Sequence, residues 1–341
     1  MNIDEIARLA GVSKSTVSRV LNNKADVSKK TFDRITEVIN DTGYTPNAFA
    51  KAINEKKAKT IGLIIPHDAD YFFSNLYYTE FLHGVSVLID EQSYYLTLFY
   101  PKFNDYILAF KQKRIDGFIV AIPAHGHEKM INSLVNVGAP LVLTGRPPAR
   151  FKDLPYVDVD DFRGAKLAMT HLIGLGHKRI AFVGEENLIS SGCRLDAYRE
   201  CLRVSGLVCD EALIRLASDN PLKAGSEIMR ELMTLPNPPT AVFFSSDMLA
   251  ISASSAVYGM GLRIPEDVSL VGYDGIIMSK YQHPPLTTVY QPAFDKGHTI
   301  AQILVDYLRD GTPMKSLCLD TPLLVRGSTG PPPNRDLPSS P

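Results

Sequence analysis

Residues 3–22 read IDEIARLAGVSKSTVSRVLN, which combines two short helical patterns with a tight turn between them. Apolar residues recur at helical spacing in the first half, and Gly11 allows the turn because a residue without Cβ adopts positive φ freely. Ser13 is a favourable N-cap for the second helix, which we expect to run from about Lys14 to Asn22. Its outer positions carry short polar groups and cations, which predicts a helix-turn-helix whose second helix enters the DNA major groove. The alternative is an ordinary small helical bundle.

Charge is distributed unevenly along the 341-residue chain. The whole sequence has 36 Lys and Arg against 37 Asp and Glu, whereas residues 1–60 carry four more cationic than acidic residues. A basic N-terminal module on a more acidic body fits a polyanionic partner for the first part only.

Targeting and redox signals indicate a cytoplasmic protein. The first residues form a charged amphipathic helix and not a signal peptide, and no apolar run approaches the roughly 20 residues of a membrane span. The four cysteines lack the spacing of a metal site, so we expect reduced thiols, no metal and no cofactor.

A third helix is expected from Lys29 to about Thr42, capped by Ser28 and ended by Gly43. The headpiece would then span residues 1–45. A short amphipathic piece, NAFAKAIN, and a charged linker follow in residues 46–59. A helix this short is marginal alone in water, so we expect DNA and a second subunit to order it, the alternative being an ordinary linker.

From residue 60 onward, strand and helix patterns alternate, which predicts parallel sheets wrapped by helices. Because one compact sheet would hold too many strands, we expect two similar α/β lobes with a ligand cleft between them. The expected core covers residues 60–327, with an N-lobe of 60–160 plus 291–317 and a C-lobe of 161–290 plus 318–327. The Pro-rich segment 328–341 is predicted to be a disordered tail, unless it is an artificial addition.

Seven motifs occur in a fixed order over residues 2–327: IARLAGVSKSTVSRVLN, VSKKTFDRITEVINDTGYTPN, HLIGLGHKRIAFVG, RLDAYRECL, PTAVFFSSDMLAISA, GLRIPEDVSLVGYD and LTTVYQP. Together they resemble the LacI/GalR (lactose-repressor) family of bacterial transcription factors. The resemblance implies a three-helix headpiece, a hinge helix and a two-lobed core like that of periplasmic binding proteins. It also implies a homodimer that binds a pseudo-palindromic operator and responds to a small metabolite.

The same resemblance assigns DNA contacts. Base-edge contacts would come from Lys14, Ser15 and Arg19, and the Arg19 guanidinium can bind a guanine bidentately. Five positions resemble the family's phosphate contacts, which set register without reading sequence, although each could also be a cap or a solvated polar residue: Ser13, Thr16, Asn22, Ser28 and Asn47. Ala50 and Ile53 match hinge positions that enter the minor groove. Ile53 stands where the family usually has Leu or Met, and it could instead pack hinge against hinge.

The effector pocket is assigned in the same way. The segment NLYYTEFLHG fits the family's aromatic pair with Tyr77 and Tyr78, and a competing alignment would choose Phe72 and Phe73. Aromatic rings with polar tips suit a sugar ring. Arg194 and Asp274 resemble ligand-binding residues, with three weaker candidates: Asp247, which could simply cap a helix, Arg146 and Asp196. Asn220 aligns where many relatives have an aromatic ring, which favours a more polar or larger ligand.

The sequence offers no catalytic motif. It contains no G-x-S-x-G, P-loop or H-E-x-x-H, and the glycines of GEENLISSG are wrongly spaced for a dinucleotide fingerprint. The absence of these motifs favours a regulator over an enzyme. The family resemblance implies a repressor of a carbohydrate-utilisation operon, released by a sugar and located with the bacterial nucleoid. The alternatives are a purine, nucleoside or protein corepressor as effector and, more distantly, a sugar-binding protein without a DNA-linked role.

Overall fold

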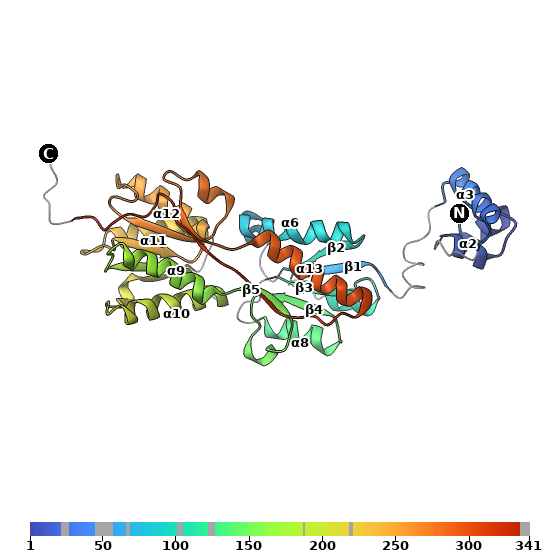
Figure 1. Cartoon of the computed structure of the whole chain (residues 1–341), viewed down its shortest axis with the longest axis horizontal. Coiled ribbons are helices and arrows are strands. Elements are labelled where there is room, and N and C mark those ends of the chain that lie inside the picture. The colour runs from blue at the N-terminus through green and yellow to red at the C-terminus, as the bar shows by residue number, and fades with distance from the viewer. Residues whose placement is uncertain are drawn as a thin grey trace.

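The computed structural model describes residues 1–21, 27–44, 57–65, 69–100, 105–121, 127–186, 188–217 and 221–334. These residues form a helical headpiece and two α/β lobes, as expected for the fold class (Figure 1). Among them, no helix is both long enough and apolar enough to cross a membrane.

The headpiece consists of α1 (Ile3–Leu9), α2 (Lys14–Leu21) and α3 (Lys29–Thr42). The three helices pack around a small apolar core: Ile6, Ala7, Ala10, Val17, Val20 and Ile35. Gly11 has a φ of 61° in the turn between α1 and α2. Gly43 has a φ of 61° at the end of α3, and the Ser28 side chain accepts a hydrogen bond from the Thr31 N–H at its start. The helix-turn-helix prediction is confirmed.

The N-lobe is built on a six-stranded parallel sheet with strand order β11-β5-β4-β3-β1-β2. Its strands are β1 (Thr60–Ile64), β2 (Tyr95–Phe99), β3 (Gly117–Val120), β4 (Leu141–Thr144), β5 (Tyr156–Val159) and β11 (Leu317–Leu319). Its helices are α5 (Ala69–Ser74), α6 (Leu76–Glu91), α7 (Asp105–Lys111), α8 (Glu128–Asn136) and α13 (Ala293–Asp310), with the 3-10 turn η1 (Ala149–Phe151).

The C-lobe sheet has the order β12-β10-β9-β8-β6-β7, and only its short strand β12 is antiparallel to its neighbour among the described strands. Its strands are β6 (Ile180–Glu185), β7 (Ile214–Ala217), β8 (Ala241–Phe244), β9 (Ser269–Asp274), β10 (Thr287–Tyr290) and β12 (Leu323–Leu324). Its helices are α9 (Asp161–Gly174), α10 (Ile189–Val204), α11 (Pro221–Met233) and α12 (Asp247–Gly259), with the 3-10 turns η2 (Glu211–Leu213) and η3 (Ile277–Tyr281).

The two lobes share one strand order, in which the second strand lies at the outside and the first pairs with the third. The chain passes between the lobes after β5, after β10 and after β11. The carboxyl ends of parallel strands form the ligand edge of such sheets, and here β5 ends where the chain enters the C-lobe. One helix start is not visible in the sequence, since α10 begins at Ile189, five residues before Arg194. Its first turn, ISSGC, has no apolar periodicity that would reveal a helix.

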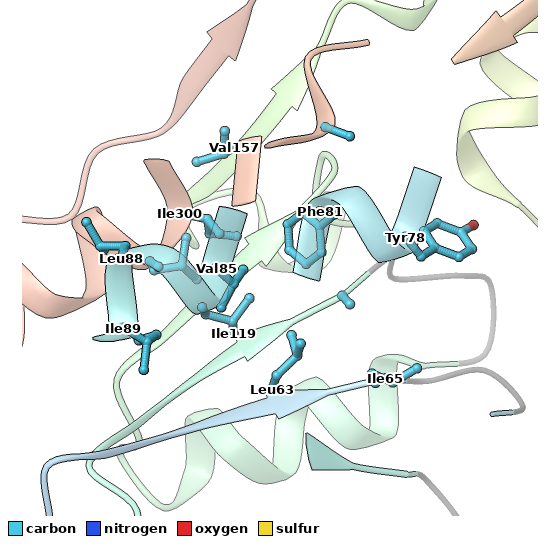
Figure 2. Packing of buried hydrophobic residues seen from close by; sticks show 14 of the residues in the cluster. Leu63, Ile65, Tyr78, Phe81, Val85, Leu88, Ile89, Ile119, Val157 and Ile300 are labelled. Atoms are coloured by element: carbon cyan, nitrogen blue, oxygen red, sulfur yellow. The ribbon is translucent and has the colours of Figure 1, made fainter. Parts of the chain in front are cut away.

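The N-lobe core packs α6 and α13 side by side on one face of the sheet (Figure 1). Figure 2 shows Phe81 and Val85 of α6 beside Leu63 and Ile119 of the sheet, with Tyr78 at the end of the row. Burying a side chain of this size contributes roughly 2 kcal/mol to stability. The cluster therefore fixes the position of α6, whose first turn contains Tyr77 and Tyr78.

The described chain continues in ordered contacts past residue 327, where we expected the disordered tail to begin. Ser328 is buried, and its hydroxyl accepts a hydrogen bond from the Thr287 N–H at 2.8 Å and donates to the Leu270 carbonyl at 2.6 Å. The Gly330 carbonyl oxygen lies 2.9 Å from Nε2 of His177. The expected boundary is therefore wrong by several residues, because Ser328 and Gly330 form hydrogen bonds with groups of the C-lobe.

Two glycines permit the close approach of α6 and α13. A Cβ on Gly84 would overlap the carbonyl oxygen of Phe294, and a Cβ on Gly297 would overlap that of Phe81.

We expect Gly84→Ala to lower the free energy of unfolding by about 2 kcal/mol or more, since the added Cβ would clash with backbone atoms of Phe294 and His298. Thermal unfolding measures this. Gly192→Ala in α10 is the matched control, because nothing lies within 4 Å of its added Cβ and alanine favours a helix. Equal melting temperatures for the two variants would contradict the packing argument.

Candidate functional site

A cavity of about 140 Å³ lies between the lobes. Its N-lobe wall includes Tyr77 and Tyr78 of α6 and the residues that follow β4 and β5. Its C-lobe wall includes Glu185 at the end of β6, Asp274 at the end of β9 and Arg194 of α10. Both sheets thus present their carboxyl ends to one space, as expected for a ligand site in parallel α/β lobes.

Arg194 is buried in the C-lobe wall of this cavity. Its Nε and Nη2 groups donate to one carboxylate oxygen of Asp161 at 2.9 and 2.6 Å, and its Nη1 donates to the carbonyl of Ser245. The guanidinium carbon lies 3.5 Å from the centre of the Tyr273 ring. Burial alone would lower the pKa of Arg194, but Asp161 and the other negative neighbours raise it, so this side chain is a fixed cation.

Asp274 and Gln291 connect the two walls. The Gln291 amide donates to Asp274 Oδ1 at 2.7 Å, and the Tyr77 hydroxyl donates to Gln291 Oε1 at 3.3 Å. Asp274 has a φ of 106°, a strained value for a residue with a Cβ, and burial raises the pKa of its carboxyl well above the usual range. Gln291 lies where the chain returns to the N-lobe, so this chain of hydrogen bonds runs from one lobe to the other.

The N-lobe wall contains its own buried ion pair. Nζ of Lys296, in α13, donates to Asp158 Oδ1 at 2.9 Å, and the Arg146 backbone N–H donates to Oδ2 of the same carboxylate at 2.9 Å. Burial alone would lower the pKa of Lys296, but Asp158 outweighs burial and raises it. The ammonium group is therefore charged and already engaged.

Glu185 is a further acidic group at the interlobe boundary. The hydroxyl of Tyr71, in the N-lobe helix α5, donates to Glu185 Oε1 at 3.3 Å and lies 3.4 Å from the Tyr78 hydroxyl. Burial raises the pKa of Glu185 to about 7, from an ordinary value of 4.5. A carboxyl that changes charge near neutral pH thus contacts both lobes.

The structure brings most of the effector residues expected from the sequence to this cavity. Tyr77 and Tyr78 line it, whereas Phe72 is packed behind Tyr78 and Phe73 is 47% exposed. This location agrees with the tyrosine alignment. Arg146, Arg194 and Asp274 also line the cavity, and Asn220 lies outside the described residues.

Asp247 and Asp196 are corrections to the sequence analysis, because neither lines the cavity. Asp247 is fully buried at the start of α12, where Oδ1 accepts from the Thr288 hydroxyl at 2.6 Å and Oδ2 accepts from the Ile276 N–H at 2.9 Å. It joins α12 to the C-lobe strands, although Ser246 and not Asp247 caps the helix. Asp196 is exposed on α10.

Sequence reasoning missed several cavity residues. Asp158 and Asp161 lie in YVDVDD, and clustered carboxylates after a strand were a usable signal for them. Lys296, Gln291 and Glu185 had no such signal, because each is recognised only by a partner far away in the sequence. Within the described residues, no group of three His, Cys, Asp or Glu side chains could hold a metal ion.

The headpiece presents the expected DNA-reading residues on the outside of α2. Lys14, Ser15 and Arg19 are exposed, and Lys14 forms a 3.0 Å ion pair with Asp4 of α1. Ser13 accepts a hydrogen bond from the Thr16 N–H at 3.2 Å, so it caps α2 as predicted. Four of the expected DNA contacts lie outside the described residues: Asn22, Asn47, Ala50 and Ile53.

A helix-turn-helix headpiece joined to a two-lobed core with a polar interlobe cavity defines a class, the ligand-binding transcriptional regulators. The chain matches the family described as bacterial regulatory proteins, lacI family, over residues 2–47. It matches the periplasmic binding protein-like domain over residues 169–329. It is 32% identical to the HTH-type transcriptional regulator CelR of Thermobifida fusca over 337 residues, which cover 96% of this chain and 97% of that protein.

Two solved structures extend the comparison. A transcriptional regulator CelR–cellobiose complex has a TM-score of 0.73 and 30% identity, covering 96% of this chain and 99% of the other. The lac repressor dimer bound to operator and the anti-inducer ONPF shares the fold, with a TM-score of 0.84, 22% identity, and coverage of 97% and 99%. This chain belongs to the LacI family of bacterial transcriptional regulators, a family of DNA-binding proteins.

The raised pKa of Glu185 has a consequence for stability. The unfolded chain releases this proton near pH 4.5 and the folded chain releases it near pH 7, so the Glu185 contribution to stability falls as pH rises through that window. We expect Glu185→Gln to be stabilised relative to the parent protein by about 2 kcal/mol more at pH 8 than at pH 4, below the full linkage value because the carboxyl is partly exposed. Denaturant unfolding of both proteins at the two pH values measures this. Exposed Glu186→Gln is the control, and an equal pH dependence in both variants would refute the assignment.

Proposed function

We propose that this protein is a homodimeric repressor of carbohydrate-utilisation genes, and that a sugar bound between the lobes releases it from a pseudo-palindromic operator. The observation that carries the proposal is the interlobe cavity, where two tyrosines face a buried arginine and aspartate in a chain with a helix-turn-helix headpiece. Because its partner is operator DNA, the protein would act in the cytoplasm, at the nucleoid. Catalysis plays no part in this role.

The chemistry of the cavity favours a sugar. Tyr77 and Tyr78 contribute aromatic rings with polar tips to the lining, and Arg194, Asp274 and Gln291 contribute donors and acceptors at fixed positions. Sugars need this combination, since their rings present apolar C–H faces edged by hydroxyl groups. The CelR–cellobiose complex, whose protein is 30% identical over 96% of this chain, adds support for a carbohydrate ligand.

The proposed switch uses the connections between the lobes. A ligand that contacts both walls favours one lobe arrangement over another, and it can shift DNA affinity only by its differential affinity for those arrangements. In the proposed division of labour, residues 1–45 read DNA, residues 46–59 form the hinge and linker, and the core that begins at residue 60 binds effector and dimerises. Asn47, Ala50 and Ile53 would contact DNA from the hinge.

Operator binding in the presence of a panel of sugars, sugar phosphates, purines and nucleosides tests the proposal. The probe is the DNA upstream of the protein's own gene, at fixed salt, because phosphate contacts make affinity salt-dependent. A tenfold loss of affinity with a sugar is expected, within the typical range of allosteric coupling. A shift with purines or nucleosides alone, or no shift until a protein partner is added, would replace the sugar by the alternative effector. Absence of specific DNA binding would overturn the whole proposal.

Arg19→Ala tests the recognition helix. Arg19 is exposed on the outer face of α2, and loss of a bidentate guanine contact is worth about 1–3 kcal/mol, so operator affinity should fall about tenfold or more. Non-specific DNA binding should change far less. Arg34→Ala, an exposed arginine on α3, is the matched control. Unchanged operator affinity in Arg19→Ala would exclude the assigned contact.

Asp274→Ala tests the link between the cavity and DNA. The variant should lose the sugar response and retain operator binding, because Asp274 lines the cavity and is remote in sequence and lobe from the headpiece. Titrations of operator with and without sugar measure both properties. Asp196→Ala, an exposed aspartate outside the cavity, should keep the full response. A normal response in Asp274→Ala would remove this residue from the effector site.

A further inference from the structure

Glu185 differs from Asp158, Asp161 and Asp274 of the cavity because no cation lies within ion-pair distance of its carboxylate among the described residues. Its side-chain hydrogen bond comes from the Tyr71 hydroxyl at 3.3 Å. The end of β6 holds this residue at the cavity wall, and its backbone N–H donates to the Ser191 hydroxyl at 2.9 Å. The structure thus already shows this carboxylate accepting a hydrogen bond from an uncharged hydroxyl.

The charged groups around the cavity are unbalanced. The described residues that line it include five carboxylates and three cations: Asp158, Asp160, Asp161, Glu185 and Asp274, and Arg146, Arg194 and Lys296. The two buried cations are committed, since Arg194 lies 2.6 Å from Asp161 and Lys296 lies 2.9 Å from Asp158. The third, Arg146, is exposed, where an ionic contact is screened by water.

This excess of carboxylates over cations is unfavourable for an anionic ligand. A phosphate or carboxylate group would have to share Arg194 or Lys296 with a buried carboxylate that already neutralises it, so it would meet like charge and no uncompensated buried cation. A sugar hydroxyl meets no such obstacle, because it donates to an acceptor and needs no cation. Hydrogen bonds to ionised acceptors are also stronger than those between neutral groups.

We propose that the cavity selects an uncharged sugar, and that Glu185 is a specificity-determining residue that accepts a hydrogen bond from one sugar hydroxyl and disfavours phosphorylated or acidic forms of the same sugar. This inference rests on the proposed sugar response and narrows its ligand class. In the structure the Tyr71 hydroxyl is the donor to Glu185, so a bound sugar hydroxyl would replace one uncharged donor by another.

Calorimetric titration of the full-length protein with matched sugars tests the inference. The probes are hexoses and disaccharides, cellobiose included, each paired with its phosphorylated or uronic acid form at pH 8 and constant ionic strength. In every pair that binds, we expect the uncharged member to bind at least tenfold more tightly. If the anionic form of any sugar binds more tightly than the uncharged form, the inference is overturned. If that anionic sugar also lowers operator affinity, the proposed sugar-responsive function still holds.

Glu185→Gln separates a specific role from a structural one. We expect its affinity for the uncharged sugar to fall about tenfold, and the preference over the anionic form to shrink because one repelling charge is gone. The affinity ratio is the decisive readout, since a distorted cavity would weaken both ligands alike. Glu186→Gln, adjacent and exposed, should behave as the parent protein. An unchanged ratio in Glu185→Gln would refute the role of Glu185, and absence of binding by every sugar would refute this inference together with the sugar response.

Discussion

The cavity depends on the buried ion pair between Arg194 and Asp161. A guanidinium group removed from water is costly unless its N–H groups find acceptors. Here Asp161 accepts two hydrogen bonds, the Ser245 carbonyl accepts another, and the Tyr273 ring lies against the cation. These partners come from α9, from the segment after β8 and from β9. One side chain therefore holds together three elements at the carboxyl edge of the C-lobe sheet and fixes the C-lobe wall of the cavity.

The N-lobe wall also contains a buried cation that is paired with a carboxylate. Lys296 and Asp158 form its buried pair, 2.9 Å apart. Asp158 and Asp161 lie three residues apart on opposite sides of the first passage between the lobes, so the segment YVDVDD gives each lobe one carboxylate. Because each ion pair lies within a single lobe, the lobes can move relative to each other without exposing a buried unpaired charge. The hydrogen bonds that do cross, from Tyr71 to Glu185 and from Tyr77 through Gln291, are between neutral donors and their acceptors.

Local signals were sufficient to predict the architecture. The limits of α3 follow from Ser28 and Gly43, whose capping roles depend only on side-chain chemistry and on freedom at positive φ. The strands were recognised because a parallel strand covered on both faces is a continuous apolar run, as in β8 (AVFF). The start of α10 has no local signal, because small polar residues and a buried arginine replace the apolar face there. Prediction failed after residue 327, because a Pro-rich composition does not reveal hydrogen bonds made by Ser328.

The chemistry of the cavity was less predictable, because the residues that form its ion pairs and hydrogen bonds are distant in the sequence. In addition, the local sequence does not distinguish one strand-end carboxylate from another. Asp247 and Asp274 both follow buried strands at the same edge of the C-lobe sheet. Asp274 lines the cavity, whereas Asp247 fills a space beside β9 that exists because Gly272 has no side chain, since a Cβ there would overlap Asp247 Oδ1. Whether Asp247 contacts the backbone or the cavity thus depends on the space left by a residue of the neighbouring strand. That dependence is a property of the packed sheet, and no pattern around either aspartate contains it.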